Sequence, residues 1–257
     1  MTCKRYSPPR RKKIKTAVSA VFCFSVIMID DKESLIKVPV EFTNTVLRVA
    51  SALNVRDCCV VGGAVRDCVL GTVSGYTTRP KDLDVILSEP LSQPHKNPNI
   101  LGIKKNSLGG TKLFVKNFGT VDVFQQYTNE PESIIANYFD FNCNSLFYHM
   151  HDNKIIESVF FDEFMESKTI SPQHIIYDKT GGTVLYGKPQ TVMRALKFQI
   201  QFNEKFNIKT NLSSDILYMI YNMNTNDEIA MKKYMASHVM DKKLQTQILQ
   251  SYQKIRG

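Results

Sequence analysis

The sequence lacks the cysteine patterns of two common classes of protein. None of its six cysteines belongs to a C-x-x-C pair, and none lies at zinc-finger spacing from a histidine. The five histidines are scattered and predict no metal centre. We therefore expect reduced cytosolic thiols that are mostly core residues, rather than a disulfide framework or a zinc module.

Long hydrophobic runs are also missing. The apolar stretch at 17–29 is too short to cross a bilayer. It follows a basic segment, as in a signal peptide, but no small-x-small cleavage site precedes Asp30. Three interpretations stay open: residues 1–28 are a tail outside the fold, translation starts at Met28, or the segment is a targeting signal. Because no second hydrophobic span exists, we expect a soluble cytoplasmic protein.

Positive charge is concentrated in the same tail. The net charge is +9, and residues 1–27 hold seven Lys or Arg and no acid, which leaves +2 for the rest of the chain. The net charge therefore does not by itself indicate a nucleic-acid surface. Five lysines on the predicted C-terminal helices are expected to form a solvated face, with RNA contact as the alternative: Lys232, Lys233, Lys242, Lys243 and Lys254.

Helix and strand patterns alternate up to about residue 188. Apolar spacing predicts a helix at 40–53 and short strands at 58–61 and 83–87. A helix at 64–70 is expected to end at Gly71. Two strand-like runs at 112–118 and 120–127 are separated by Gly119 and predict a hairpin.

Beyond about residue 189 the pattern is entirely helical. The predicted helices there lie at 191–206, 213–222, 227–240 and 241–255, and Thr225 or Asn226 is expected to cap the third of these. One further helix is predicted earlier in the chain, at 132–139. We therefore predict an α/β (α+β) domain with a mixed sheet at 29–188, followed by a small all-α extension at 189–257.

Gly62-Gly63 stands between a predicted strand and a predicted helix. Glycines at such a turn let the backbone bend sharply and approach a ligand closely. The amides at the start of the helix would then favour an anion. Alone, the pair is also what a plain structural turn would contain.

Three aspartates add chemistry to this turn. Asp82 and Asp84 alternate in a strand and therefore share a face, where their charges repel unless a cation lies between them. Asp122 is a third carboxylate, inside the apolar strand Val121–Phe124. Oxygen ligands suit Mg²⁺. Together with the Gly-Gly turn, the three carboxylates indicate a site that holds a triphosphate and two Mg²⁺ ions.

The arrangement resembles the signature of class II tRNA nucleotidyltransferases and bacterial poly(A) polymerases, members of the DNA polymerase β superfamily. The residues that carry the resemblance are Val60-Val61-Gly62-Gly63-Ala64-Val65-Arg66-Asp67-Cys68-Val69-Leu70-Gly71, Asp82-Leu83-Asp84, Gly110-Thr111, Asp140-Phe141-Asn142-Cys143-Asn144-Ser145 and Arg194-Ala195-Leu196-Lys197-Phe198. The resemblance implies a polymerase β-like head followed by a neck, with ATP or CTP as substrate and a tRNA 3′ end as acceptor. It also implies nucleotide-binding roles for Gly62, Gly63, Arg66, Asp140, Asn144 and Arg194. Arg66 could instead pair with Asp67; the resemblance favours phosphate.

The sequence departs from that family in two motifs. Tyr138 and Phe139 replace the two arginines of the ribose-binding motif, and 187–191 lacks the family's base-reading Glu-Asp-x-x-Arg. We therefore expect a Mg²⁺-dependent, template-independent RNA nucleotidyltransferase, most simply one that adds or repairs CCA or A on tRNA. The alternatives are a transferase that modifies a protein or a defence-related RNA, and a catalytically silent RNA- or nucleotide-binding homologue.

Overall fold

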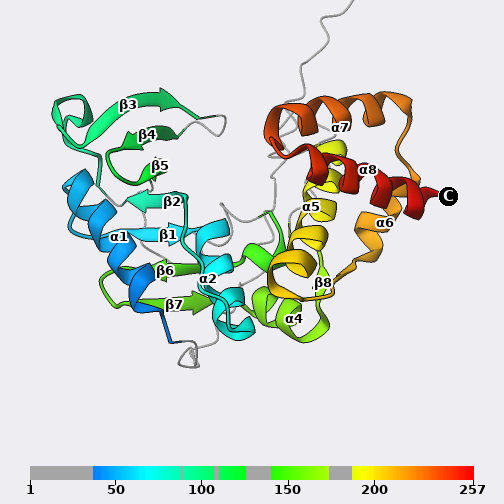
Figure 1. The fold of residues 1–257 in the computed structure, drawn as a ribbon, viewed down its shortest axis with the longest axis horizontal. Helices are drawn as coiled ribbons and strands as arrows, with labels where there is room; N and C mark the ends of the chain where they lie inside the picture. The colour runs from blue at the N-terminus through cyan, green and yellow to red at the C-terminus, as the bar shows by residue number, and fades with distance from the viewer. Residues whose placement is uncertain (1–36, 88, 107–109, 126–139, 174–186) are drawn as a thin grey trace, which may run out of the picture.

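The computed structural model describes residues 37–87, 89–106, 110–125, 140–173 and 187–257. These residues form a sheet with helices packed on it, and a group of C-terminal helices beside it (Figure 1). The predicted tail at 1–28, the predicted helix at 132–139 and the last two residues of the predicted strand at 120–127 lie outside the described residues.

Seven strands make one mixed sheet in the order β3-β4-β5-β2-β1-β6-β7. Their bounds are β1 Cys59–Val61, β2 Asp82–Leu87, β3 Ile100–Lys105, β4 Thr111–Val115, β5 Gly119–Gln125, β6 Leu146–His149 and β7 Lys154–Glu157. The neighbours β2 and β5 run parallel, and every other neighbouring pair is antiparallel. The predicted hairpin is confirmed as β4 and β5, but its turn lies at residues 116–118, and Gly119, the predicted break, is the first residue of β5.

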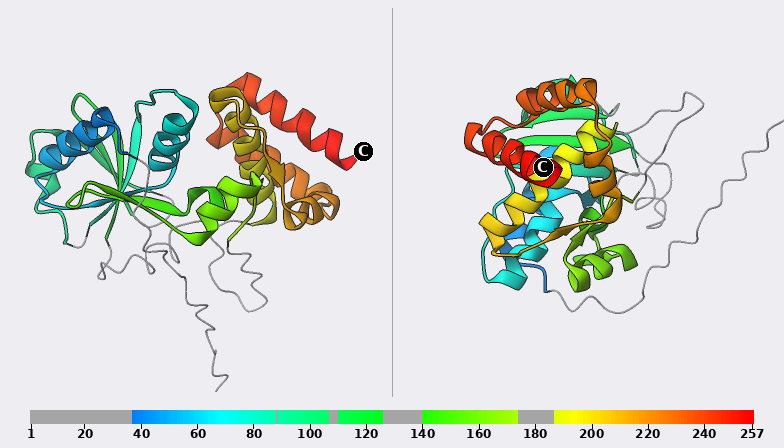
Figure 2. Two further views of the ribbon diagram at one scale, coloured as in Figure 1. Left: turned by 90° about the horizontal axis from the view of Figure 1, so that it is seen from below. Right: turned by 90° about the vertical axis from the view of Figure 1, so that its right-hand side faces the viewer.

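The two faces of this sheet differ in chemistry. Helices α1 (Val40–Leu53) and α2 (Gly63–Ser74) pack on one face, where Leu83, Val85 and Val121 are buried with them in the main core (Figure 2). Because strand residues alternate between faces, the residues between these apolar positions lie on the other face. Those residues include the three predicted carboxylates.

Helix α2 is longer than predicted. It does not end at Gly71 but continues to Ser74, and Gly75 provides the left-handed C-cap with φ +73°. Gly71 is required for a different reason: a Cβ there would lie 2.7 Å from the carbonyl oxygen of Tyr76. The glycine therefore allows the following loop to pack closely on the helix.

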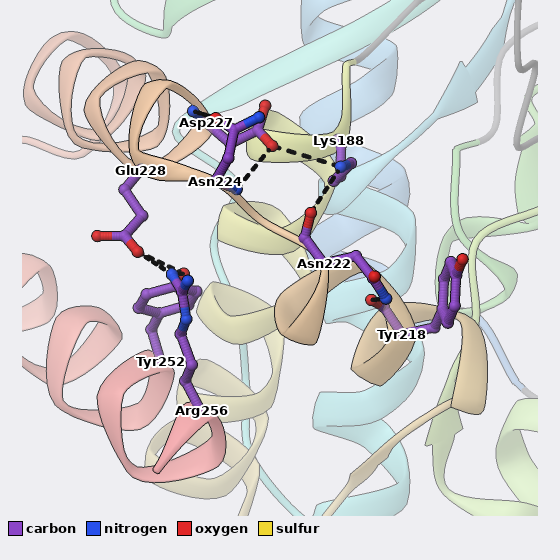
Figure 3. A network of polar contacts seen from close by, with 8 residues as sticks. All are labelled: Lys188, Tyr218, Asn222, Asn224, Asp227, Glu228, Tyr252 and Arg256. Carbon is purple, nitrogen blue, oxygen red and sulfur yellow. Dashed lines mark hydrogen bonds and ion pairs between the residues drawn. The ribbon is translucent and has the colours of Figure 1, made fainter.

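Four helices form the C-terminal extension, as predicted: α5 (Lys188–Phe206), α6 (Ser214–Tyr221), α7 (Thr225–His238) and α8 (Lys242–Arg256). The predicted cap of α7 is wrong by one or two residues, because Asn224 and Asp227 form a reciprocal capping box. Lys188 Nζ donates to the Asn222 carbonyl at 3.0 Å and lies 3.3 Å from Asp227, so one lysine ties α5 to α6 and α7 (Figure 3).

Sheet and helical extension share one continuous hydrophobic core. Phe198 and Phe202 of α5 contact Phe141 and Phe164, with ring centroids 5.4 and 5.6 Å apart. The smaller elements at this junction are η2 (Asn142–Asn144), α4 (Val159–Ser167), β8 (Thr169–Ile170) and β9 (Asn211–Leu212), and η1 (Pro94–Lys96) lies elsewhere. None of the described helices is both long and apolar enough to cross a membrane.

Candidate active site

Strands β2 and β5 bring the predicted carboxylates together. Asp84 and Asp122 are direct partners in the parallel register, and Asp82 precedes Asp84 by two residues on the same face. Partner residues on neighbouring strands lie about 5 Å apart. The sheet therefore places three carboxylates on the face that α1 and α2 leave free.

Gly62 fits against this group. It follows β1, whose last residue Val61 is the register partner of Asp84. Its φ is +74°, which L side chains rarely adopt, and a Cβ there would lie 2.7 Å from Asp84 Oδ2. No side chain caps the N-terminus of α2 at Gly62, so the first-turn amides are available to an anion beside the carboxylates.

Asp84 is the most strongly perturbed member of the group. Burial, followed by the charges of Asp122 and Asp82, raises its pKa from 3.8 to about 7, against the opposing effect of Lys112 and Arg194. No hydrogen bond or ion pair links the Asp84 carboxylate to another described residue. A cation at this carboxylate would therefore relieve an electrostatic cost.

The carboxylates do not enclose a finished metal site. Among the described residues, no three His, Cys, Asp or Glu side chains are gathered closely enough to hold an ion by themselves. Mg²⁺ commonly binds through one or two carboxylates together with substrate phosphates. The Asp82 and Asp84 oxygens, beside the open helix N-terminus at Gly62, fit a Mg²⁺ ion of that kind.

Asp122 has partners that the sequence did not reveal. Lys112 Nζ lies 2.6 Å from its Oδ2, and Asn106 Nδ2 donates to its Oδ1 at 3.1 Å. Both of its oxygens are therefore engaged, whereas those of Asp84 are not.

The remaining predicted residues form a second group, on the side of the extension. Asn144 accepts a hydrogen bond from Arg66 Nη1 at 2.8 Å and donates one to Asp140 Oδ1 at 3.0 Å. The other Asp140 oxygen lies 2.7 Å from Arg194 Nε and 2.6 Å from its Nη2. The structure thus joins four predicted nucleotide-binding residues into one chain of polar contacts across α2, η2 and α5.

Arg66 is held at the end of this chain by Asp67, its alternative partner in the sequence analysis, and by two aromatic rings of α5. Its Nη2 lies 2.6 Å from Asp67 Oδ1, and its guanidinium lies over the Phe198 and Phe202 rings at 4.8 and 5.3 Å. Asp67 also pairs with Lys205 at 2.5 Å. Arg66 is only 7% exposed. In this structure it forms the ion pair with Asp67, which the sequence analysis gave as the alternative to a phosphate contact.

Lys197 of α5 is influenced by charges of both groups. Burial, followed by the charges of Arg194 and Arg66, lowers the pKa of its ammonium, while Asp82 and Asp67 act in the opposite direction. No ion pair engages Lys197 among the described residues. Lys197 is therefore a positively charged side chain of α5 that is affected by the Asp82 carboxylate.

The other predicted features lie away from this site. At the position of the base-reading motif, Lys188 is engaged by α6 and α7. The five C-terminal lysines are all exposed, and Lys243 lies 3.7 Å from Glu204. Exposure agrees with a solvated face and leaves RNA contact as a hypothesis.

Comparison with known proteins gives matches in structure alone. No protein-family model and no curated protein matches the sequence. The apo form of a CCA-adding enzyme aligns with a TM-score of 0.53 at 14% identity, over 84% of this chain and 49% of that one. A CCA-adding enzyme in complex with ATP gives 0.52 at 14%, over 83% and 50%.

A third match is the Thermotoga maritima CCA-adding enzyme complexed with tRNA, with a TM-score of 0.50 at 13% identity, over 83% of this chain and 50% of that one. The chain thus spans about half the length of these solved structures. Over the aligned part, the chain therefore shares the fold of these CCA-adding enzymes.

Proposed function

We propose that this protein is a Mg²⁺-dependent, template-independent RNA nucleotidyltransferase. It would transfer a nucleoside monophosphate from a nucleoside triphosphate to an RNA 3′ hydroxyl and release pyrophosphate. The observation that carries the proposal is the register of Asp84 with Asp122, with Gly62 packed against Asp84. The division into a head at 29–188 and an extension at 189–257 belongs to the same proposal.

The residues would divide the work as follows. Asp82 and Asp84 would hold divalent cations, with Asp122 completing the carboxylate group. Such cations neutralise the leaving pyrophosphate and lower the pKa of the attacking hydroxyl. The amides at the start of α2 would bind the triphosphate, because a helix N-terminus favours anions. Catalysis of this kind depends on positioning and charge neutralisation.

The polar chain on the extension side would set the shape of the nucleotide pocket. Asp140 and Arg194 hold each other through two contacts. Arg66 holds Asn144. We assign these four residues to the walls of the site, where Arg194 and Lys197 add positive charge for a polyanionic substrate. The acceptor is proposed to be a tRNA 3′ end, in line with the fold of the matching enzymes.

The proposal is tested by transfer of labelled nucleotide. The assay contains Mg²⁺, one of the four nucleoside triphosphates at a time, and tRNA without its 3′ CCA. The variant Asp82→Ala/Asp84→Ala should lose the activity, and Asp215→Ala, an exposed residue of α6, should retain it.

The outcomes separate the remaining possibilities. Label on tRNA from CTP and ATP indicates CCA addition, and label from ATP alone indicates A addition. Label on a protein band would replace the RNA acceptor with a protein. Activity that survives in the double variant, or no transfer together with no Mg²⁺-dependent nucleotide binding, would refute the proposal.

A further inference from the structure

Three charged residues form a row across three neighbouring strands. Lys112 of β4 is the register partner of Asp122 of β5, which is in turn the partner of Asp84 of β2. Direct partners lie on the same face of a sheet. A lysine therefore stands beside the candidate metal ligands, on the face they share.

The two carboxylates of this row have different surroundings. The Asp122 side chain is 16% exposed and has Lys112 at one oxygen and Asn106 at the other. The side chain of Asp84, its neighbour, has no hydrogen bond or ion pair with any described residue. The sheet thus leaves one carboxylate open and closes the next one with an ammonium group.

An ammonium group and a divalent cation compete for the same carboxylate. Lysine carries a compact point charge that pairs readily with carboxylates and with phosphates. At 2.6 Å from Asp122 Oδ2, the Lys112 ammonium occupies the side from which an ion would approach that oxygen, and like charges at such separations repel strongly.

We propose that Lys112 is the built-in counter-cation of Asp122, so that the protein without nucleotide presents one divalent-cation site, at Asp82 and Asp84. The inference rests on the proposed function and deepens it. The triphosphate is the alternative partner of the Lys112 ammonium. Asp122 becomes accessible to a second cation only when that polyanion draws the lysine away.

The test is a titration of the protein without nucleotide with Mn²⁺. The electron paramagnetic resonance signal of free Mn²⁺ measures how many ions bind and how tightly. We expect one ion per chain in the wild type. Lys112→Met should bind a second ion, or bind Mn²⁺ about tenfold more tightly, since it removes one positive charge at contact distance. Adding Asp122→Asn to Lys112→Met should restore the wild-type behaviour.

Two further variants make the test specific. Lys104→Met removes an equal charge from the register partner of Lys112 on β3, which lies over the Phe114 ring. It should leave Mn²⁺ binding unchanged. Lys112→Arg keeps the charge and should keep the wild-type number of ions. If circular dichroism shows that Lys112→Met is unfolded, Lys112→Gln, which also removes the charge, replaces it with the same expected result.

The outcomes distinguish this inference from the proposed function. Two ions of similar affinity in the wild type, or unchanged binding in folded Lys112→Met, would overturn the role of Lys112. In that event, loss of transfer in Asp82→Ala/Asp84→Ala would still support the proposed function. Absence of Mn²⁺ binding in every variant would overturn both.

Discussion

Arg66 provides a sharp test of how the two halves of the site are built. It was expected to contact phosphate, yet it is enclosed by Asp67, Asn144 and two aromatic rings. If its main role is to join α2 to α5, then Arg66→Met should reduce stability first and nucleotide binding only as a consequence.

The size of the effect follows from burial. The side chains of Arg66 and Asp67 are 9% and 23% exposed. Removing one partner of a buried ion pair costs about 3–5 kcal/mol. Because Lys205 remains with Asp67, we expect the lower end, about 3 kcal/mol. In a chain of this size each kcal/mol lowers Tm by about 2–4 °C, which gives a decrease of about 6–12 °C.

The assay is thermal unfolding followed by circular dichroism, together with KM for the nucleotide. Arg66→Lys keeps the charge but loses the planar fork, and should cost about 1–2 kcal/mol. Arg48→Met removes an exposed arginine of α1 and should change the free energy of unfolding by less than about 0.5 kcal/mol. A Tm within about 2 °C of the wild type, with a large rise in KM, would refute the structural role of Arg66 in joining α2 to α5. It would instead indicate that Arg66 binds phosphate.

Three further variants extend the test to other charged groups. Asp84→Asn should lower transfer by about 10³-fold or more while Tm stays constant or rises, because it removes repulsion from two neighbouring carboxylates; a fall of several degrees would argue against that repulsion. Lys197→Met should raise KM for the triphosphate severalfold with little change in Tm, and an unchanged KM in a kinetic assay would remove Lys197 from the site. At Glu157, burial and then the charge of Asp162 raise the pKa from 4.5 to about 7, so the folded state is penalised as pH rises from 4.5 to 7. Because the side chain is partly exposed, solvent screening reduces the effect, and Glu157→Gln should raise the free energy of unfolding by about 2 kcal/mol above pH 7 and hardly at all at pH 4. Denaturant titrations showing equal gains at both pH values would contradict this explanation.

The local pattern of the sequence was enough to predict the carboxylate face. Alternation in β2 puts Asp82 and Asp84 on one side, and the short apolar strand before Gly62 places the turn next to them. That Asp122 lies directly beside Asp84 could not be predicted, because the pairing of β2 with β5 is a tertiary choice between segments almost forty residues apart.

Lys112 was missed although a signal for it exists. The hairpin of β4 and β5 turns through residues 116–118, where Asn117 has a positive φ of 61°. Once that turn is placed, counting back along both strands sets position 112 opposite position 122. The hairpin was predicted with its turn at Gly119, and this misplaced turn is the reason that Lys112 was missed.

Other features had no local signal. The hydrogen bond between Arg66 and Asn144 joins residues 78 positions apart. Strand β3 follows a proline-rich connection and ends in Lys104 and Lys105, so its pattern is weak, as is common for an edge strand. The cap of α7 was misplaced because Asn224, Thr225 and Asn226 are all plausible caps, and the Asp227 contact decides among them.

The packing of α5 determines how the protein can be divided in the laboratory. A fragment ending near residue 187 would keep every strand of the main sheet. It would nevertheless lose Phe198 and Phe202, leaving the Arg66 guanidinium without its aromatic platform and Phe141 and Phe164 without their ring contacts to α5. Such a fragment would expose to water a surface of apolar and charged side chains that α5 normally covers, and it should aggregate during expression. The smallest useful crystallisation or screening target therefore runs through α5 into the helices that support it.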